Sequence, residues 1–353
     1  MPKYSPLAEV HAELDAKMIP FQGWSVPAGY PGGAVAEHRH TRKYCSVFDY
    51  SFCGKIRVAG KDCAKALDEV LFKMVSPLEP GSIQTNYLLD DNGSFIDAVT
   101  IFRMAEDDCF IITNAVNTAK VLEHFSKLLP QDITVQDLTE VIARIDIQGP
   151  ESVNVLAEAE VDVQELPGSG NCKMIEIAGI RCIAGSMEPC GERGFELFCG
   201  ADNAIDLWDE LTCIEPVRPA GVSAFDSLRI EMGYPAWGSE ITPELSPLDL
   251  AMEIPQKKFS GSKALLNREK RFKIIYAMLN SRQTAKNGDT VKLESGTVAG
   301  VVTSGTQAPS LDHACVICRV QAQCDLPAGT KIILQSEKTA FEAVVCDAPF
   351  YKK

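Results

Sequence analysis

Several features are scarce in this 353-residue sequence, and each absence argues against a class of protein. No apolar run reaches the roughly 18 to 20 residues that a membrane-spanning helix requires. Residues 1–18 lack the apolar core of a secretory signal peptide, which favours a cytoplasmic protein. Lys and Arg number 34 against 48 Asp and Glu, so the net charge is −14. This charge argues against binding to nucleic acid or to an anionic membrane surface.

The chain has 13 cysteines, but few of them have the close paired spacing that is typical of metal ligands. Cys315 and Cys318 form a tight pair, with His313 before them and Cys324 after them. A structural zinc site would need a second pair of matching spacing, and the sequence offers none. We therefore predict no metal site and expect HACVIC to be a buried strand carrying small thiols. The scattered cysteines are typical of free thiols in a reducing cell.

The residues that are present support a protein of mixed secondary structure. Hydrophobic residues make up 46% of the chain, enough to fill the cores of two or three domains. Apolar periodicity predicts helices and strands in irregular alternation, which is typical of an α+β fold. From about Arg271 onward, short strands with glycine turns predict an all-β terminal domain. The expected helices include 7–17, 34–44, 61–72, 118–129 and 204–212, and the expected strands include 47–58, 142–147, 173–177 and 181–185.

One segment, TNYLLDDNGSFIDAVTIF at 85–102, combines a turn pattern with a single acid in an apolar strand. Asp90 to Gly93 can bond their own backbone and tolerate positive φ, so we predict a hairpin there. Asp97 follows in the second strand. Burying an unpaired carboxylate costs several kcal/mol, so Asp97 should lie at a rim, pair with a cation or contact a ligand. The alternative is a strand residue that faces solvent.

Nine motifs occur along nearly the whole chain. They are PFQGWSVP (20–27), EHRHTRKYCSVFDYS (37–51), NYLLDDNGSFIDAVTIF (86–102), TNAVNTAK (113–120), IDIQGPES (145–152), CGERGFEL (190–197), FDSLRIEMGYPAWGSEI (225–241), FSGSKAL (259–265) and VTSGTQAPSL (302–311). Each motif alone is weak. In this order they make the chain resemble the glycine-cleavage T-protein family of tetrahydrofolate-dependent aminomethyl and methyl transferases.

The resemblance implies an α+β fold with three domains in a cloverleaf around a central hole that holds folate. Residues 1–49 and 138–240 would form a split folate-binding α/β domain. Residues 50–137, with about 241–270 returning, would form a second α+β domain. Residues 271–353 would form a C-terminal all-β domain, a barrel or a jelly-roll-like structure.

The resemblance also implies site residues. Glu196 would be the carboxylate that binds the pterin, since a carboxylate can pair with an amide-like ring edge. Asn114 would line the pocket. The alternatives are a surface strand residue for Glu196 and a turn-forming asparagine for Asn114. We expect Tyr87 and Trp237 to contact the cofactor as well.

The departures from the family pattern change the expected chemistry. The family places its catalytic carboxylate directly after Asp97, where this chain has Ala98. Because side chains alternate between the faces of a strand, Asp97 can take the place of this catalytic carboxylate only if a β-bulge turns its side chain to the opposite face. Phe225 stands where the family has an arginine. We therefore expect transfer of a methyl or related one-carbon group from a small methylated donor to tetrahydrofolate, which depends more on alignment than on a strong base.

An acid that protonates the leaving group would assist such a transfer. The candidates are Asp97, Tyr87 and Tyr234. Trp24, like Trp237, could form a pocket wall that attracts a cationic donor, or could be a core residue. Arg103 could hold a donor carboxylate, or could be a solvated cation at the strand end.

Two other functions stay open at this point. One is orthodox aminomethyl transfer in glycine cleavage, with a lipoylated carrier protein as partner. The other is folate binding without catalysis, because expected site residues are missing. The family's iron–sulfur-assembly branch carries a KGCYxGQE motif that this chain lacks, which argues against the non-catalytic reading.

Overall fold

The chain forms two compact units in the computed structural model, which describes residues 2–281, 283–311 and 313–353. Unit 1 comprises the residues up to Leu89 together with Ile96–Ala224 and Lys257–Ser260. Unit 2 comprises Asp90–Phe95, Phe225–Gln256 and Gly261–Lys353. Within the described ranges, no helix has the length and apolar character needed to cross a membrane. The division into three domains stays a prediction.

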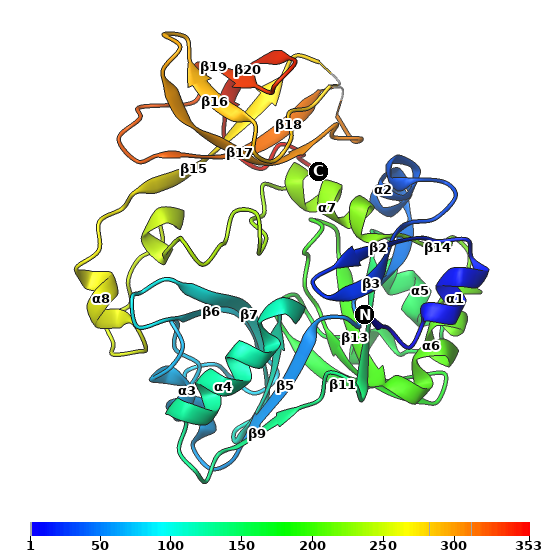
Figure 1. The fold of residues 1–353 in the computed structure, drawn as a ribbon. Coiled ribbons are helices and arrows are strands. Elements are labelled where there is room, and N and C mark those ends of the chain that lie inside the picture. Colours follow the sequence, from blue (N-terminus) through cyan, green and yellow to red (C-terminus); the bar gives the residue numbers. More distant parts are fainter. Residues whose placement is uncertain (1, 282, 312) are drawn as a thin grey trace. The chain divides into compact units, whose positions relative to one another are not determined.

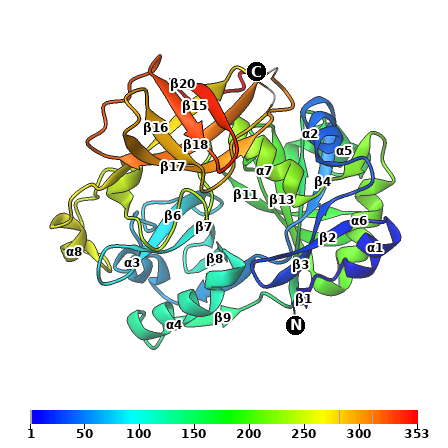
Figure 2. The same cartoon turned by 45° about the horizontal axis from the view of Figure 1, so that its top comes forward.

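A six-stranded sheet of unit 1 carries one apolar face and one face that combines buried polar side chains with apolar ones, which we call its polar face. Ile145 and Ile147 alternate with Asp146 and Gln148 along one strand, so the two kinds of side chain point in opposite directions. The apolar face packs against α5 (Ser152–Glu158) and α6 (Ala204–Thr212) (Figure 2). In spatial order the strands are β11 (Cys172–Ile177), β12 (Ile180–Gly185), β13 (Gly194–Gly200), β10 (Ile142–Gln148), β4 (Cys45–Asp49) and β14 (Val217–Pro219).

A five-stranded sheet of unit 1 contains the predicted hairpin. Its strands are β6 (Ile83–Leu89), β7 (Phe95–Ala105), β8 (Asp108–Thr113), β5 (Gly54–Ala59) and β9 (Thr134–Asp137), in that spatial order. Asp90 Oδ1 accepts hydrogen bonds from the Asn92 and Ser94 backbone N–H groups, and Gly93 has a φ of 74°. These contacts confirm the hairpin. The helices α3 (Cys63–Asp68) and α4 (Thr118–Leu128) pack against this sheet, where Val121 and Phe125 of α4 enter the core (Figure 1).

The N-terminal elements correct three predictions. The helix expected over 7–17 is shorter, α1 (Ala8–Glu13), because Lys17 already begins a strand. The strand expected over 47–58 is interrupted by a turn between β4 and β5. The helix expected over 61–72 ends at Asp68, because Leu71 and Phe72 pair with β6 instead. A small sheet and a helix complete this region: β1 (Lys3–Tyr4), β3 (Trp24–Gly29), β2 (Lys17–Phe21) and α2 (Ala34–Lys43).

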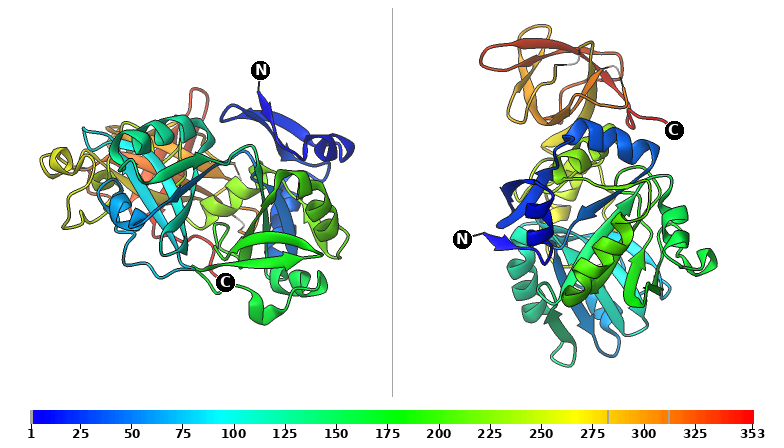
Figure 3. Two further views of the ribbon diagram at one scale, coloured as in Figure 1. Left: turned by 90° about the horizontal axis from the view of Figure 1, so that it is seen from below. Right: turned by 90° about the vertical axis from the view of Figure 1, so that its right-hand side faces the viewer.

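The C-terminal part of unit 2 is a closed barrel, seen from other sides in Figure 3. Its strands follow the order β15 (Phe272–Leu279), β18 (Ala314–Gln321), β17 (Val298–Thr306), β16 (Thr290–Leu293), β19 (Lys331–Gln335) and β20 (Ala340–Cys346). Cys315 and Cys318 are buried in β18, as expected for HACVIC. The protein therefore has a mixed α+β fold with a barrel, and not a jelly roll. The remaining helices are α7 (Val222–Glu231), α8 (Ser262–Leu266), η1 (Ala115–Asn117), η2 (Val163–Glu165), η3 (Ala201–Asn203) and η4 (Pro247–Leu250).

Candidate functional site

The polar face of the six-stranded sheet is buried, which is unusual for four polar side chains on neighbouring strands. Arg144, Asp146 and Gln148 lie on this face of β10, and Glu196 lies on the adjacent strand β13, directly opposite Asp146. We call these four residues the polar cluster. Phe195 and Leu197 point into the apolar core on the other face. The alternative of a surface strand residue for Glu196 is therefore wrong.

Arg144 links the two carboxylates of the polar cluster. Its Nε and Nη2 donate to the two oxygens of Asp146, both at 2.7 Å, and Nη2 lies 2.9 Å from Glu196 Oε1. Its guanidinium also lies over the rings of Tyr50 and Phe198, 5.2 and 5.7 Å from their centroids. Burial raises the pKa of Glu196 to about 7, against the opposing effect of Arg144. Glu196 can therefore gain or lose a proton near neutral pH.

Part of the polar cluster consists of unsatisfied hydrogen-bonding groups. Among the residues that the structure describes, Glu196 Oε2 and both polar side-chain atoms of Gln148 are buried without a partner. A Cβ at position 194 would lie 2.3 Å from Gln148 Oε1, so Gly194 makes room for this amide. Unsatisfied buried polar groups are costly and rare. The cluster thus offers a carboxylate and an amide to a ligand with adjacent donors and acceptors.

Asp97 lies in a second polar arrangement, on β7 of the five-stranded sheet. It is 0% exposed. Its Oδ1 accepts from the Ala98 N–H and from the side-chain amides of Asn114 and Asn117, and its Oδ2 accepts from the Asn114 N–H, at 2.7–3.0 Å. Burial raises the pKa of Asp97 to about 7, although these hydrogen bonds lower it. Because Asp97 is fully buried, the rim and solvent-facing alternatives are wrong. Among the described residues, no cation pairs with it, and its hydrogen-bond partners are neutral amides.

The described part of β7 shows no bulge between Phe95 and Ile101 that would turn Asp97 to the opposite face, and its register shift lies beyond, at Arg103/Ala105. Burial alternates without interruption from Phe95 to Ile101, with Asp97 on the face of Val99 and Ile101, which pack against α3 and α4. Ala98 is half-buried on the other face, together with Phe102. Figure 1 shows β7 within this sheet. The Phe102 ring packs edge-on against Phe198, with centroids 5.3 Å apart, and Phe198 follows Glu196 by two residues on β13. Position 98 therefore shares the face that packs towards the strand of Glu196.

Asp97→Asn is expected to remove part of the pH dependence of stability. The pKa of Asp97 is raised from 3.8 to about 7 in the folded state, so between these values the folded protein holds more protons than the unfolded chain. The contribution of Asp97 to stability is therefore complete below pH 3.8 and is lost as pH rises through 7. The slope is at most about 1.4 kcal/mol per pH unit.

Urea unfolding of wild type and Asp97→Asn between about pH 5 and 7 measures this difference in slope. Asp137→Asn, at an exposed carboxylate of the same sheet, is the control and should keep the wild-type slope. Identical slopes for Asp97→Asn and wild type would contradict the raised pKa.

The other predicted site residues lie in different surroundings. Asn114 Nδ2 donates to Asp97 Oδ1 and to the Ala98 carbonyl, so this side chain holds the strand that carries Ala98. Tyr87 is buried edge-on to Phe72, and burial raises its pKa. Trp24 is a core residue beside Val26 and Phe52.

Three further predicted residues differ in their burial and in the unit to which they belong. Tyr234 and Trp237 belong to unit 2, where Tyr234 is 40% exposed and Trp237 is half-buried. Arg103 is 5% exposed, so the prediction of a solvated strand-end cation is wrong. Its guanidinium contacts two cysteine sulfurs, on the same face of β7 as Ile101.

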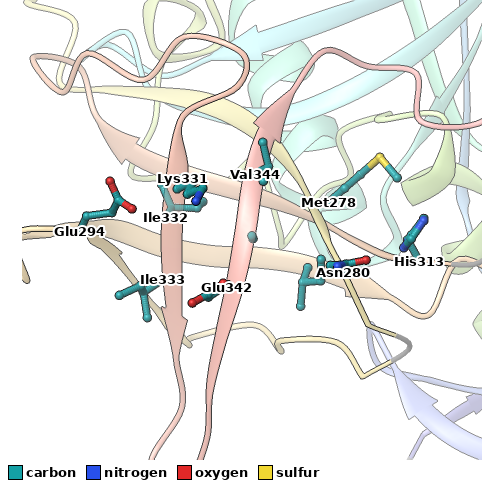
Figure 4. Close-up of a pocket in the computed structure, with 11 residues that line it drawn as sticks. Met278, Asn280, Glu294, His313, Lys331, Ile332, Ile333, Glu342 and Val344 are labelled. Atoms are coloured by element: carbon teal, nitrogen blue, oxygen red, sulfur yellow. The ribbon is translucent and has the colours of Figure 1, made fainter.

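The barrel carries a groove of about 580 Å³ that contains none of the predicted site residues. Figure 4 shows Lys331 and Glu342 from β19 and β20 among the side chains that line it, with Met278 and His313. In the described ranges, no group of three or more His, Cys, Asp and Glu side chains is placed to hold a metal ion. The polar cluster is therefore the best-supported ligand site.

Comparison with known proteins agrees with the fold. Residues 7–258 match the GCVT N-terminal domain, and residues 273–352 match the glycine cleavage T-protein C-terminal barrel domain. The chain belongs to the glycine-cleavage T-protein family. An aminomethyltransferase of Deinococcus deserti is 33% identical over 354 residues, covering 99% of this chain and 97% of the relative. One of Saccharopolyspora erythraea is 30% identical over 365 residues, covering 100% and 99%.

A solved structure extends the match to three dimensions. The crystal structure of glycine cleavage system aminomethyltransferase T from Bartonella henselae superposes with a TM-score of 0.92 at 28% identity, covering 99% of this chain and 98% of the other. The full-length matches identify the present protein, by its sequence, as an enzyme of one-carbon transfer. Proteins of the family use tetrahydrofolate. The spare acceptor of Glu196 and the unpartnered amide of Gln148 fit a pterin edge, which presents amide-like donors and acceptors.

The sequence interpretation missed three members of the polar cluster. The sequence pattern does indicate a strand with two different faces, because polar residues (Arg144, Asp146, Gln148) alternate with apolar ones (Ala143, Ile145, Ile147). Periodicity does not tell whether the polar side meets solvent or another layer, so the strand predicted over 142–147 carried no expectation for these side chains.

Proposed function

We propose that this T-protein relative moves a methyl or related one-carbon group from a small methylated donor to tetrahydrofolate. The observation that carries the proposal is the contrast between two positions. The polar cluster retains a carboxylate and an amide suited to a pterin. Position 98, where the family resemblance puts a catalytic carboxylate, is an alanine on the strand face that packs towards the cluster.

Each residue has a role in this proposal. Glu196 and Gln148 bind the pterin edge, and Arg144 holds Glu196 in place through Nη2. Asp97 is a positioning residue, because its carboxylate fixes Asn114 and the Ala98 N–H from the opposite face. Tetrahydrofolate supplies the nitrogen that accepts the one-carbon group. Methyl transfer to such a nitrogen depends chiefly on alignment of donor and acceptor, so it tolerates an alanine at 98.

The roles of the remaining candidates stay predictions. Tyr87 and Tyr234 are candidate proton donors to the leaving group, and Trp237 is a candidate contact of the cofactor. Trp24 packs in a core, which argues against a donor-binding role for it. Arg103 faces α3 instead of the cluster, which argues against a clamp on the donor carboxylate.

The decisive experiment offers tetrahydrofolate and a panel of S-, O- and N-methylated small donors to the purified protein. Formation of methyltetrahydrofolate, measured by mass, with one donor class supports the proposal. Binding of tetrahydrofolate without turnover of any methyl donor would sink the methyl-donor reaction. Failure to bind tetrahydrofolate at all would contradict the assignment of the cluster.

Orthodox aminomethyl transfer is the second candidate, because the relatives that cover the whole chain are named aminomethyltransferases. Its partner would be a lipoylated carrier protein. Methylenetetrahydrofolate formed only from an aminomethylated carrier would establish it in place of methyl transfer. The same assay, with carrier added, therefore separates the two reactions.

Glu196→Gln is expected to weaken tetrahydrofolate binding by about 10- to 150-fold, because a hydrogen bond to a charged group contributes roughly 1.5–3 kcal/mol. Isothermal titration of tetrahydrofolate into the two proteins measures the ratio of dissociation constants. Glu176→Gln, at an exposed residue of the same sheet, is the matched control and should bind as wild type does. Equal affinities for wild type and Glu196→Gln would remove Glu196 from the site.

A further inference from the structure

Arg103 lies in an unusual environment for a buried cation. The pairing of β7 with β8 sets Arg103 directly opposite Cys109, just before a register shift that accommodates one extra residue of β7. Its Nη1 lies 3.5 Å from Cys109 Sγ and 3.9 Å from the Sγ of Cys63, the first residue of α3. Both cysteines are 0% exposed. Three elements of unit 1 thus bring one guanidinium and two sulfurs together.

The charge of Arg103 requires a partner at this place. An arginine stays protonated in proteins, and an unpaired buried charge costs several kcal/mol. Among the described residues, no carboxylate forms an ion pair with Arg103, and its buried Nε has no hydrogen-bond partner. The two sulfurs are the groups that its guanidinium contacts through Nη1. A thiolate on one of them would neutralise the buried charge.

The two cysteines differ in their readiness to ionise. The Cys109 hydrogen bond and Arg103 lower the pKa of Cys63 to about 7, while burial and the charge of Asp107 oppose this. The pKa of Cys109 is raised, first by its hydrogen bond to Cys63 and then by burial. Both shifts favour a thiolate on Cys63 over one on Cys109.

We propose that Cys63 and Cys109 form a redox modification site, in which Arg103 stabilises the Cys63 thiolate and a hydroperoxide converts the pair to a disulfide. This site is separate from the polar cluster and does not depend on the proposed folate reaction. A hydroperoxide is the oxidant in this proposal because both sulfurs are buried and only a small molecule could reach them.

The reaction balances with one equivalent of hydrogen peroxide. The Cys63 thiolate attacks one peroxide oxygen, an S–O bond forms, the O–O bond breaks, and hydroxide leaves. Cys109 then gives up its proton and attacks the Cys63 sulfur, so that the S–S bond forms and the S–O bond breaks. The two sulfurs lose two electrons, peroxide gains them, and the products are water and hydroxide. Arg103 stays protonated and loses its anionic partner.

The first test uses the intact wild-type protein. The protein is treated with equimolar hydrogen peroxide at neutral pH, its free thiols are alkylated, and it is digested without reduction for mass spectrometry. The expected product joins the peptides of Cys63 and Cys109 and disappears after treatment with dithiothreitol. If other cysteines are oxidised while Cys63 and Cys109 are recovered as alkylated, still-reduced thiols, the proposal is overturned.

Variants test the role of the guanidinium. Arg103→Met is expected to slow peroxide oxidation of Cys63 at least tenfold, whereas Arg103→Lys, which keeps the charge, should retain most of the rate. Cys109→Ser should stop at a Cys63 sulfenic acid that dimedone traps. Cys182→Ser, at a buried cysteine of the six-stranded sheet whose pKa burial raises to about 12, is the control and should oxidise as wild type does. Equal rates in wild type and Arg103→Met would refute the thiolate pair.

Discussion

Ala98→Asp is expected to raise the rate of aminomethyl transfer from a lipoylated carrier by about 10²- to 10⁴-fold, the usual effect of one positioned acid–base group. The reason is geometric. Residue 98 is half-buried on the face of β7 that includes Phe102, so a carboxylate there would point away from Asp97 and its amides. The rate of methylenetetrahydrofolate formation, measured for the variant and for wild type, gives the ratio.

Two further variants separate the carboxylate from its position. Ala98→Asn has nearly the same shape as Ala98→Asp without the charge, and Thr100→Asp places an acid two residues along the same face of β7. Neither is expected to raise the rate. A comparable rise in Ala98→Asn would show that bulk, and not proton transfer, limits the reaction. No rise in Ala98→Asp would show that position 98 does not reach the reacting groups.

Arg144→Met is expected to lower the free energy of unfolding of unit 1 by about 3–5 kcal/mol, because it leaves Asp146 and Glu196 buried without their shared cation. Methionine is apolar and unbranched like the arginine stem, so the loss reflects the charge more than the volume. Without Arg144 the pKa of Glu196 would rise above its wild-type value of about 7, so the part of the stability deficit due to Glu196 should shrink as pH falls towards 7.

The measurement must report on unit 1 alone. Trp24 and Trp208 belong to unit 1 and Trp237 to unit 2, so urea unfolding is followed by fluorescence in a Trp237→Phe background. Arg57→Met is the matched control, because Arg57 makes a similar two-pronged contact with Asp108 at the surface. Its effect should stay below about 1 kcal/mol. Equal losses in the two variants would contradict a special role for the buried pair.

Local sequence patterns predicted much of the fold. Turn residues at Asp90–Gly93 set the hairpin, and short strands with glycine turns after Arg271 predicted the all-β domain that forms the barrel. The helix expected over 61–72 failed for a tertiary reason. Leu71 and Phe72 continue the apolar spacing of α3 but pair with the backbone of β6. Strand pairing with a distant segment overrides helical spacing at a helix end.

Only part of the candidate site could be predicted from the sequence. The family motif pointed to Glu196, and its burial beside Arg144 agrees with a ligand role. Asp97 drew attention as a lone acid in an apolar strand, but its partners Asn114 and Asn117 lie 17 and 20 residues away in the chain. A pairing of that kind depends on how η1 returns to the sheet, which no local pattern encodes.

By itself, the sequence determined the family, the strands of the barrel and the two-sided character of β7 and β10. The tertiary structure decided which side of each strand is covered and by what. A period of two residues defines two faces of a strand but does not say whether helices, a second sheet or solvent meets each face. For this reason the sequence pattern did not predict the burial of the polar cluster, the amide partners of Asp97 or the thiol partners of Arg103. The packing of the sheets determines all three.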